Sequence, residues 1–256
     1  LDFRRGDRTT TTGVTIAKGA QQREVGQSPS WDEDMALLVT CEHAAESTPL
    51  PFGLLEETLQ GTHWAFDPGA LAFAEELVST CNATLVAATF SRLLIDPNRP
   101  LASDTLFRDK CGDVEVATNI QLDNAEKMRR IGRFYVPFHR TIGAAKETVQ
   151  PKLIISVHSF NQTYQRQAGI PPERRNFEVG VLCTFDDELA AHFCDAFNAA
   201  GIPARINEPY SGRDGIMFSA EAAACPPRGS ADRVPCIMFE FRNDVCQSRS
   251  WRKQAL

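Results

Sequence analysis

The chain has 256 residues, of which 43% are hydrophobic, and it carries a formal net charge of −6 at pH 7. A chain of this length and composition can bury a sizeable core without disulfide staples, and one α/β domain is the simplest arrangement. The acidic balance argues against nucleic acid or an anionic membrane as a partner. No apolar stretch approaches the roughly 18 residues of a transmembrane helix.

The N-terminal lead differs in composition from the rest of the chain. Residues 1–30 are rich in Thr, Gln, Arg and Gly and show no sustained periodicity, so we expect a poorly ordered or peripheral lead before a single catalytic domain over 31–256. Because the chain starts at Leu1 and not at Met, a fragment or a processed product is expected. Eight scattered cysteines without a CxxC pair are typical of a reduced cytoplasmic protein, with organellar import left open.

Strands and helices alternate along the remainder of the chain. Apolar runs predict strands over 37–40, 83–89, 91–96, 153–157, 177–184, 204–207 and 236–242. Helical spacing predicts helices over 52–60, 70–81, 119–148 and 188–200 and a short one at the C-terminus, with a kink or an end at Pro137. This alternation predicts a three-layer αβα domain around a mixed, largely parallel sheet.

Polar residues that could bind a metal follow two of the predicted strands. His43 comes directly after the first strand with Glu46 three residues later, and His158 ends the strand that begins at Leu153. Strand ends are where open α/β sheets gather their ligands. Two histidines and a carboxylate would complete the three protein ligands of a catalytic zinc site. The alternative is that the His43/Glu46 pair is incidental surface polarity.

Seven short motifs resemble those of the N-formylglutamate amidohydrolases, also called N-formylglutamate deformylases, over roughly residues 36–250. In chain order they are CEHA (41–44), FDPGA (66–70), SRLLIDPNR (91–99), YVPFHRTI (135–142), SVHS (156–159), NEPYSG (207–212) and EFRND (240–244). That family is similar in fold and site to the zinc carboxypeptidases. The resemblance implies one Zn²⁺ per chain held by His43, Glu46 and His158, and a small N-acyl amino acid as the substrate.

Other residues receive roles from their chemistry and from the resemblance. Glu240, between two phenylalanines on a core strand, is the expected general base, or else a structural partner of Arg242. By similarity to the carboxypeptidases, Asn98 and Arg99 would clamp the substrate α-carboxylate, and Arg92 would stabilise the oxyanion, unless Asp96 merely ties one arginine to its loop. Two further residues have open roles. They are Tyr210, which closes over the substrate or simply packs, and Asp67, which orients a ligand histidine or caps a helix.

The leading hypothesis is therefore a zinc-dependent amidohydrolase that cleaves N-formyl-L-glutamate or a similar N-acyl amino acid. A carboxypeptidase-like hydrolase of small peptides and a catalytically silent binding protein of the same fold are the alternatives. The sequence leaves the acyl group, the preferred side chain and the oligomeric state undetermined.

Overall fold

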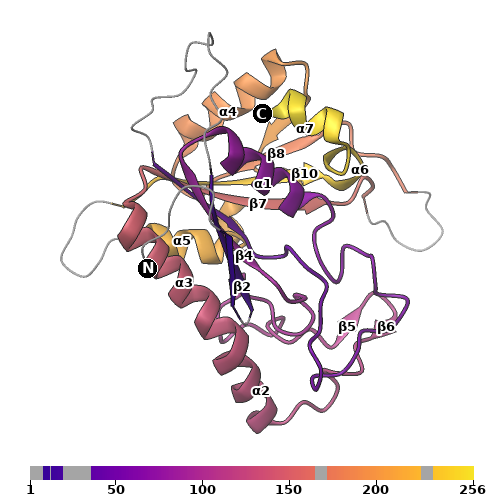
Figure 1. The fold of residues 1–256 in the computed structure, drawn as a ribbon. Coiled ribbons are helices and arrows are strands. Elements are labelled where there is room, and N and C mark those ends of the chain that lie inside the picture. The colour runs from indigo at the N-terminus through magenta and orange to yellow at the C-terminus, as the bar shows by residue number, and fades with distance from the viewer. Residues whose placement is uncertain (1–7, 12, 20–35, 165–171, 226–232) are drawn as a thin grey trace.

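A central sheet of eight strands organises the protein (Figure 1). The computed structural model describes residues 8–11, 13–19, 36–164, 172–225 and 233–256. The strands are β1 (Arg8–Thr11), β2 (Val14–Lys18), β3 (Leu37–Cys41), β4 (Ala83–Ala88), β7 (Leu153–Phe160), β8 (Val179–Leu182), β9 (Ala204–Ile206) and β10 (Cys236–Arg242). Their order across the sheet is β1-β2-β4-β3-β7-β10-β8-β9. The pairs β4/β3, β3/β7, β7/β10 and β8/β9 are parallel, which confirms the mixed, mostly parallel sheet.

Helices cover both faces of this sheet (Figure 1). They are α1 (Ala70–Thr80), α2 (Asn124–Arg130), α3 (Val136–Val149), α4 (Asp187–Ala199), α5 (Phe218–Ala224), α6 (Asn243–Cys246) and α7 (Arg249–Ala255). Because side chains alternate across a strand, neighbouring residues of β3 enter different cores. Val39 belongs to the core cluster that includes residues of α1 and α4, whereas Leu38 belongs to the cluster that includes residues of α3 and α5. Strands buried on both faces explain the unbroken apolar runs in the sequence.

The N-terminal segment contains more regular structure than its composition suggests. Residues 8–11 and 14–18 pair as the antiparallel strands β1 and β2, and β2 pairs antiparallel with β4 at one side of the sheet. Val14 is buried there. The lead was expected to be either poorly ordered or peripheral, and these residues form paired strands at one edge of the sheet. Short polar strands gain their stability from pairing with a neighbour and carry little periodic signal of their own. Residues 1–7, 12 and 20–30 of the expected lead lie outside the described part of the chain.

Two predicted elements are absent from the described structure. Residues 52–60 form turns in place of a helix, and residues 91–96 form a buried turn in place of a strand. The apolar run Leu93–Ile95 is nonetheless fully buried, with Leu93 in one core cluster and Leu94 and Ile95 in another. A loop buried between two core clusters needs consecutive apolar residues, and in the sequence such a run cannot be told from a buried strand.

The long helical segment after residue 119 follows its prediction with one adjustment. Helix α2 begins after Asp123, whose side chain accepts a hydrogen bond from the Glu126 N–H, and α3 ends at Val149. Between them lies a π-helical turn, Ile131–Tyr135, which ends two residues before Pro137. Since proline cannot donate the usual backbone hydrogen bond, a local change of helical pitch lets the chain continue through it.

Strand order decides which side chains meet. Strands β3, β7 and β10 are neighbours, and Glu240 of β10 pairs in register with His158 of β7. His43 follows β3 by two residues. Parallel strands end at the same edge of a sheet, so these three residues gather there.

Candidate active site

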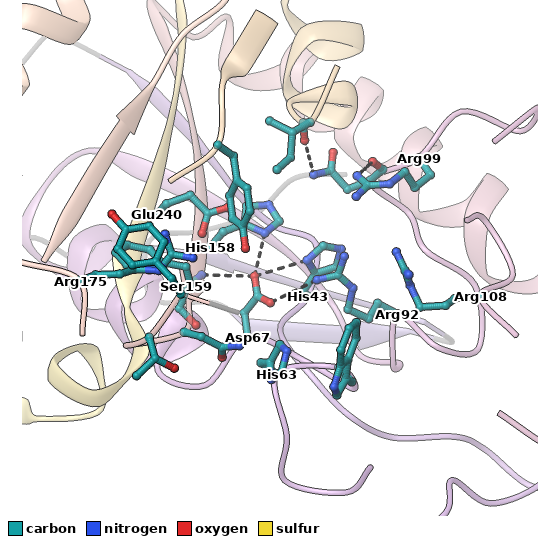
Figure 2. A pocket seen from close by; sticks show the side chains of 18 residues that line it. His43, His63, Asp67, Arg92, Arg99, Arg108, His158, Ser159, Arg175 and Glu240 are labelled. Atoms are coloured by element: carbon teal, nitrogen blue, oxygen red, sulfur yellow. Dashed lines mark hydrogen bonds and ion pairs between the residues drawn. The ribbon is translucent and has the colours of Figure 1, made fainter. Parts of the chain in front are cut away.

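Three buried side chains with metal-ligating atoms meet at this edge of the sheet (Figure 2). Nδ1 of His158 lies 2.8 Å and Nδ1 of His43 lies 3.3 Å from the same oxygen, Oδ2 of Asp67. The two imidazole rings are nearly perpendicular, with centroids 4.7 Å apart. One ligand atom from each residue lies within 4.8 Å of the others, so the cluster is compact enough to surround a single ion.

Backbone contacts bring Asp67 to the histidines. The Asp67 N–H donates to the carbonyl of His43 at 2.9 Å, and the Ser159 N–H donates to the Asp67 carboxylate at 3.2 Å. Gly69, which has a φ of +88°, follows at the start of α1, where a Cβ atom would lie 2.8 Å from the backbone of Cys246. A glycine is thus required for the chain to enter α1 at this distance from α6.

Carboxylates orient both histidines from the side that faces away from Asp67. His43 Nε2–H donates to Oδ1 of Asp96 at 2.8 Å, and His158 Nε2–H donates to Oε2 of Glu42 at 3.0 Å. Metal-ligating histidines characteristically make such an outer hydrogen bond, which fixes the ring and leaves the inner nitrogen for the ion. Two inner nitrogens and one carboxylate therefore fit the three protein ligands of a catalytic zinc site.

Hydrogen bonding also controls the protonation of the cluster. Burial alone would lower the pKa of His158, but hydrogen bonds to Asp67 and Glu42 raise it to about 10. Burial alone would raise the pKa of Asp67, whereas the two histidines hold it well below its usual range. A metal ion and a proton consequently compete for the inner nitrogen of His158.

Glu46 does not join this cluster. Its side chain is exposed and accepts a hydrogen bond from the Gly61 N–H. Residues 44–49 form no helical turn, so the three-residue spacing from His43 does not turn both side chains to one side. Glu46 was expected as the third ligand, and Asp67 was expected to orient a histidine or to cap a helix. In the structure Asp67, and not Glu46, completes the cluster with the two histidines.

Glu240 is buried beside the cluster and lines the same cavity. One of its carboxyl oxygens, Oε2, is buried without a hydrogen-bond partner. Desolvation raises the pKa of Glu240 to about 8. Arg242, the alternative partner considered for it, pairs with Asp244 and Glu178. A desolvated carboxyl with a free oxygen next to ligand-type residues has the properties of a general acid–base group.

The loop after β4 supplies the expected cations. Arg92 forms ion pairs with Asp96 at 3.1 Å and with Asp67 at 3.5 Å, so the tie between Asp96 and an arginine is present. Arg99 donates from Nε to Thr105 and from Nη1 to the carbonyl of Asn98. No carboxylate of the described residues forms an ion pair with Arg99, which leaves its guanidinium open to an anion.

The side chain of Asn98 serves mainly to hold the loop in place. Its amide nitrogen donates to the carbonyl of Ile216 at 2.7 Å, and its oxygen accepts from the Ser219 N–H at 3.0 Å. One amide hydrogen remains for a ligand. His139 also fixes this loop through a hydrogen bond between its Nε2 and the Pro97 carbonyl at 3.0 Å.

A cavity of about 470 Å³ joins these groups, a size typical of small-molecule sites. Tyr210 lines it and remains 43% exposed, which suits a residue at the entrance. Arg108 and Arg175 also line it, and sequence reasoning did not select them. Arg175 follows another arginine in the loop before β8, and nothing in the spacing distinguishes the two.

A mixed α/β sheet with two buried histidines, a buried aspartate and a desolvated glutamate at its strand ends has the groups of an enzyme site that is compatible with a metal. The chain belongs to the N-formylglutamate amidohydrolase family, since a sequence model of that family matches residues 35–246. This match confirms the resemblance found in the seven motifs.

Solved structures support the same assignment of fold. A gene product from Agrobacterium tumefaciens, Atu2144, is 30% identical, covers 94% of this chain and 89% of its own, and superposes with a TM-score of 0.75. An N-formylglutamate amidohydrolase from Ralstonia eutropha JMP134 is 19% identical, covers 96% and 94%, and superposes with a TM-score of 0.64. No curated protein matches the sequence significantly. No helix among the described residues is both long and apolar enough to cross a bilayer.

Proposed function

We propose that the protein is a zinc-dependent amidohydrolase that releases formate from N-formyl-L-glutamate or cleaves a similar N-acyl amino acid. The observation that carries the proposal is that the His43–Asp67–His158 cluster, the unpartnered carboxyl of Glu240 and the open guanidinium of Arg99 share one cavity. Family membership supplies the reaction class. In a substrate with an amide and a free carboxylate, the amide would react beside Glu240 and the carboxylate would bind Arg99.

The metal would be held by His43, Asp67 and His158, one ion per chain. When bound, zinc supplies Lewis-acid chemistry by polarising the amide carbonyl and acidifying water. Asp96 and Glu42 hold the two imidazole rings in place. Arg92 forms an ion pair with Asp67. From this position its guanidinium would stabilise negative charge on the carbonyl oxygen of the substrate.

Glu240 would move the proton. As a base, its carboxylate accepts a proton from the attacking water, and as an acid it returns that proton to the leaving nitrogen. The elevated pKa of the group lies close to neutral pH, so both the neutral and the ionised form are populated there and proton transfer in both directions is accessible. Tyr210 at the entrance would close over the bound substrate.

Hydrolysis and metal content test the proposal together. The purified chain should contain about one zinc, as three protein ligands imply, and should release formate from N-formylglutamate faster than from other N-formyl amino acids. A chelator should remove both metal and activity, and added zinc should restore them. Absence of hydrolysis of every N-formyl and other N-acyl amino acid by the metal-loaded protein would contradict the proposal, and cleavage of dipeptides in its place would favour the carboxypeptidase-like alternative.

Arg99 is expected to bind the α-carboxylate of the substrate. Arg99→Ala should raise KM by roughly 30-fold or more, because truncating one partner of a buried charge pair costs about 2–5 kcal/mol. Arg99→Lys should recover only part of this loss, since an ammonium cannot reproduce the bidentate fork. Arg92→Ala should instead lower kcat. The measurement is kcat/KM for N-formylglutamate and for its α-amide, and equal values in the unaltered protein would exclude the clamp.

A further inference from the structure

The cavity has arginines on two sides of the His43–Asp67–His158 cluster. Figure 2 shows Arg92, Arg99 and Arg108 on one side and Arg175, near Ser159 and Glu240, on the other. The first group includes the cations assigned above to the α-carboxylate and the carbonyl oxygen. Arg175 has no part in those assignments.

Arg175 is held rigidly by its backbone. Its N–H donates to the carbonyl of Gln162 at 2.9 Å, and its carbonyl accepts from Nη1 of Arg242 at 3.1 Å. Arg242 is itself fixed by ion pairs with Asp244 at 2.7 Å and Glu178 at 3.3 Å. The position of Arg175 is thus preorganised before any ligand arrives.

Aromatic rings fix the direction of the side chain. The guanidinium carbon lies 4.2 Å from the ring centroid of Tyr164 and 5.3 Å from that of Phe160. Stacking engages the flat faces of a guanidinium and leaves its N–H groups free at the edge. An edge of this kind matches the two oxygens of a carboxylate.

Arg175 lacks the partner that a buried cation requires. The residue is only 9% exposed, and its Nε is buried without a hydrogen-bond acceptor. No carboxylate of the described residues forms an ion pair with it, whereas the adjacent Arg174 pairs with Asp244 at 2.6 Å. Because an unpaired and largely buried charge is unfavourable, an anion bound in the cavity would compensate the charge of the Arg175 guanidinium.

We propose that Arg175 binds a second carboxylate of the substrate and thereby makes the enzyme selective for dianionic N-acyl amino acids. The inference rests on the proposed function for the identity of the first carboxylate. The second carboxylate can belong to the side chain of the amino acid or to an acidic acyl group, and both present the same chemistry to Arg175. The residue is a specificity determinant and takes no part in proton transfer.

Equilibrium binding tests the proposal independently of hydrolysis. The dissociation constants of succinate, glutarate and adipate are compared with those of their monoamides by calorimetry on the full chain. At least one diacid should bind more tightly than its monoamide by about 30-fold or more, as expected for a desolvated charge pair. Arg175→Met, which keeps an apolar stem against the two rings, should remove most of this preference, and Arg175→Lys should retain an intermediate part of it.

Arg174→Met is the matched control, because it removes a neighbouring arginine whose side chain is 63% exposed and outside the cavity lining. The control should keep the full preference for the diacid. An unchanged preference in both Arg175 variants, or an equal loss in Arg174→Met, would overturn the proposal even if the enzyme releases formate. Conversely, a diacid preference that depends on Arg175 would stand even if no formate were released.

Kinetics with paired substrates identify the source of the carboxylate. A side-chain source predicts that Arg175→Met lowers the kcat/KM ratio of N-formylglutamate to N-formylglutamine, chiefly through KM. An acyl source predicts the same change for N-succinylalanine relative to N-butyrylalanine. Either change supports the assignment, whereas unaltered ratios for both pairs would contradict it.

Discussion

Asp67→Asn should abolish stoichiometric metal binding and hydrolysis, whereas Glu46→Gln should leave both nearly unchanged. Asp67 is the buried carboxylate that lies within 3.3 Å of both inner histidine nitrogens, and Glu46 is exposed. Loss of a metal-binding carboxylate should reduce affinity by more than the roughly 10- to 100-fold that follows loss of a group supporting a ligand. Metal content after dialysis, measured beside formate release, provides the comparison.

Glu46→Gln serves as the control for this comparison because it changes the same chemical group at the position suggested by the HxxE spacing. Folding of both variants can be checked by thermal melting. Metal retention by Asp67→Asn together with metal loss in Glu46→Gln would reverse the assignment and restore the ligand set inferred from local spacing.

Glu240→Gln should keep metal and fold but lower kcat by about 10²–10⁴, the usual contribution of a general acid–base group. The amide is nearly the same size as the carboxyl and cannot accept the proton. The acid limb of the pH–rate profile that depends on Glu240 should also disappear. A rate equal to that of the unaltered enzyme would assign proton transfer to another residue.

Stability of the metal-free protein provides a control for the Glu240 variant. Burial raises the pKa of this carboxyl from about 4.5 to about 8. Between these values the folded state holds a proton that the unfolded state has released, so the free energy of unfolding falls as the pH rises through this window. Glu240→Gln should remove this dependence and melt at a higher temperature than the unaltered chain at pH 8. A variant that does not fold would instead indicate a structural role.

Much of the scaffold and two of the three residues of the candidate cluster could be predicted from the chain alone. Strands buried on both faces carry continuous apolar runs, and the strands that hold His158 and Glu240 were placed correctly for this reason. The order of seven motifs identified the family, which the match over residues 35–246 confirms. His43 and His158 were selected because they follow or end such strands, and parallel strand ends must converge.

The remaining features depended on contacts between residues distant in sequence. Asp67, 24 residues from His43, reaches the cluster through the path of a loop that ends in the turn at Gly69, whereas Glu46 lies near His43 in sequence and turns away. The sequence does not distinguish Arg174 from Arg175. In the structure Arg175 is buried in the cavity, whereas Arg174 pairs with Asp244 at the surface. Periodicity and motifs in the sequence predict the local path of the chain and the faces of its elements that are buried. Which carboxylate meets two histidines, and which arginine lacks a partner, is decided by packing in three dimensions.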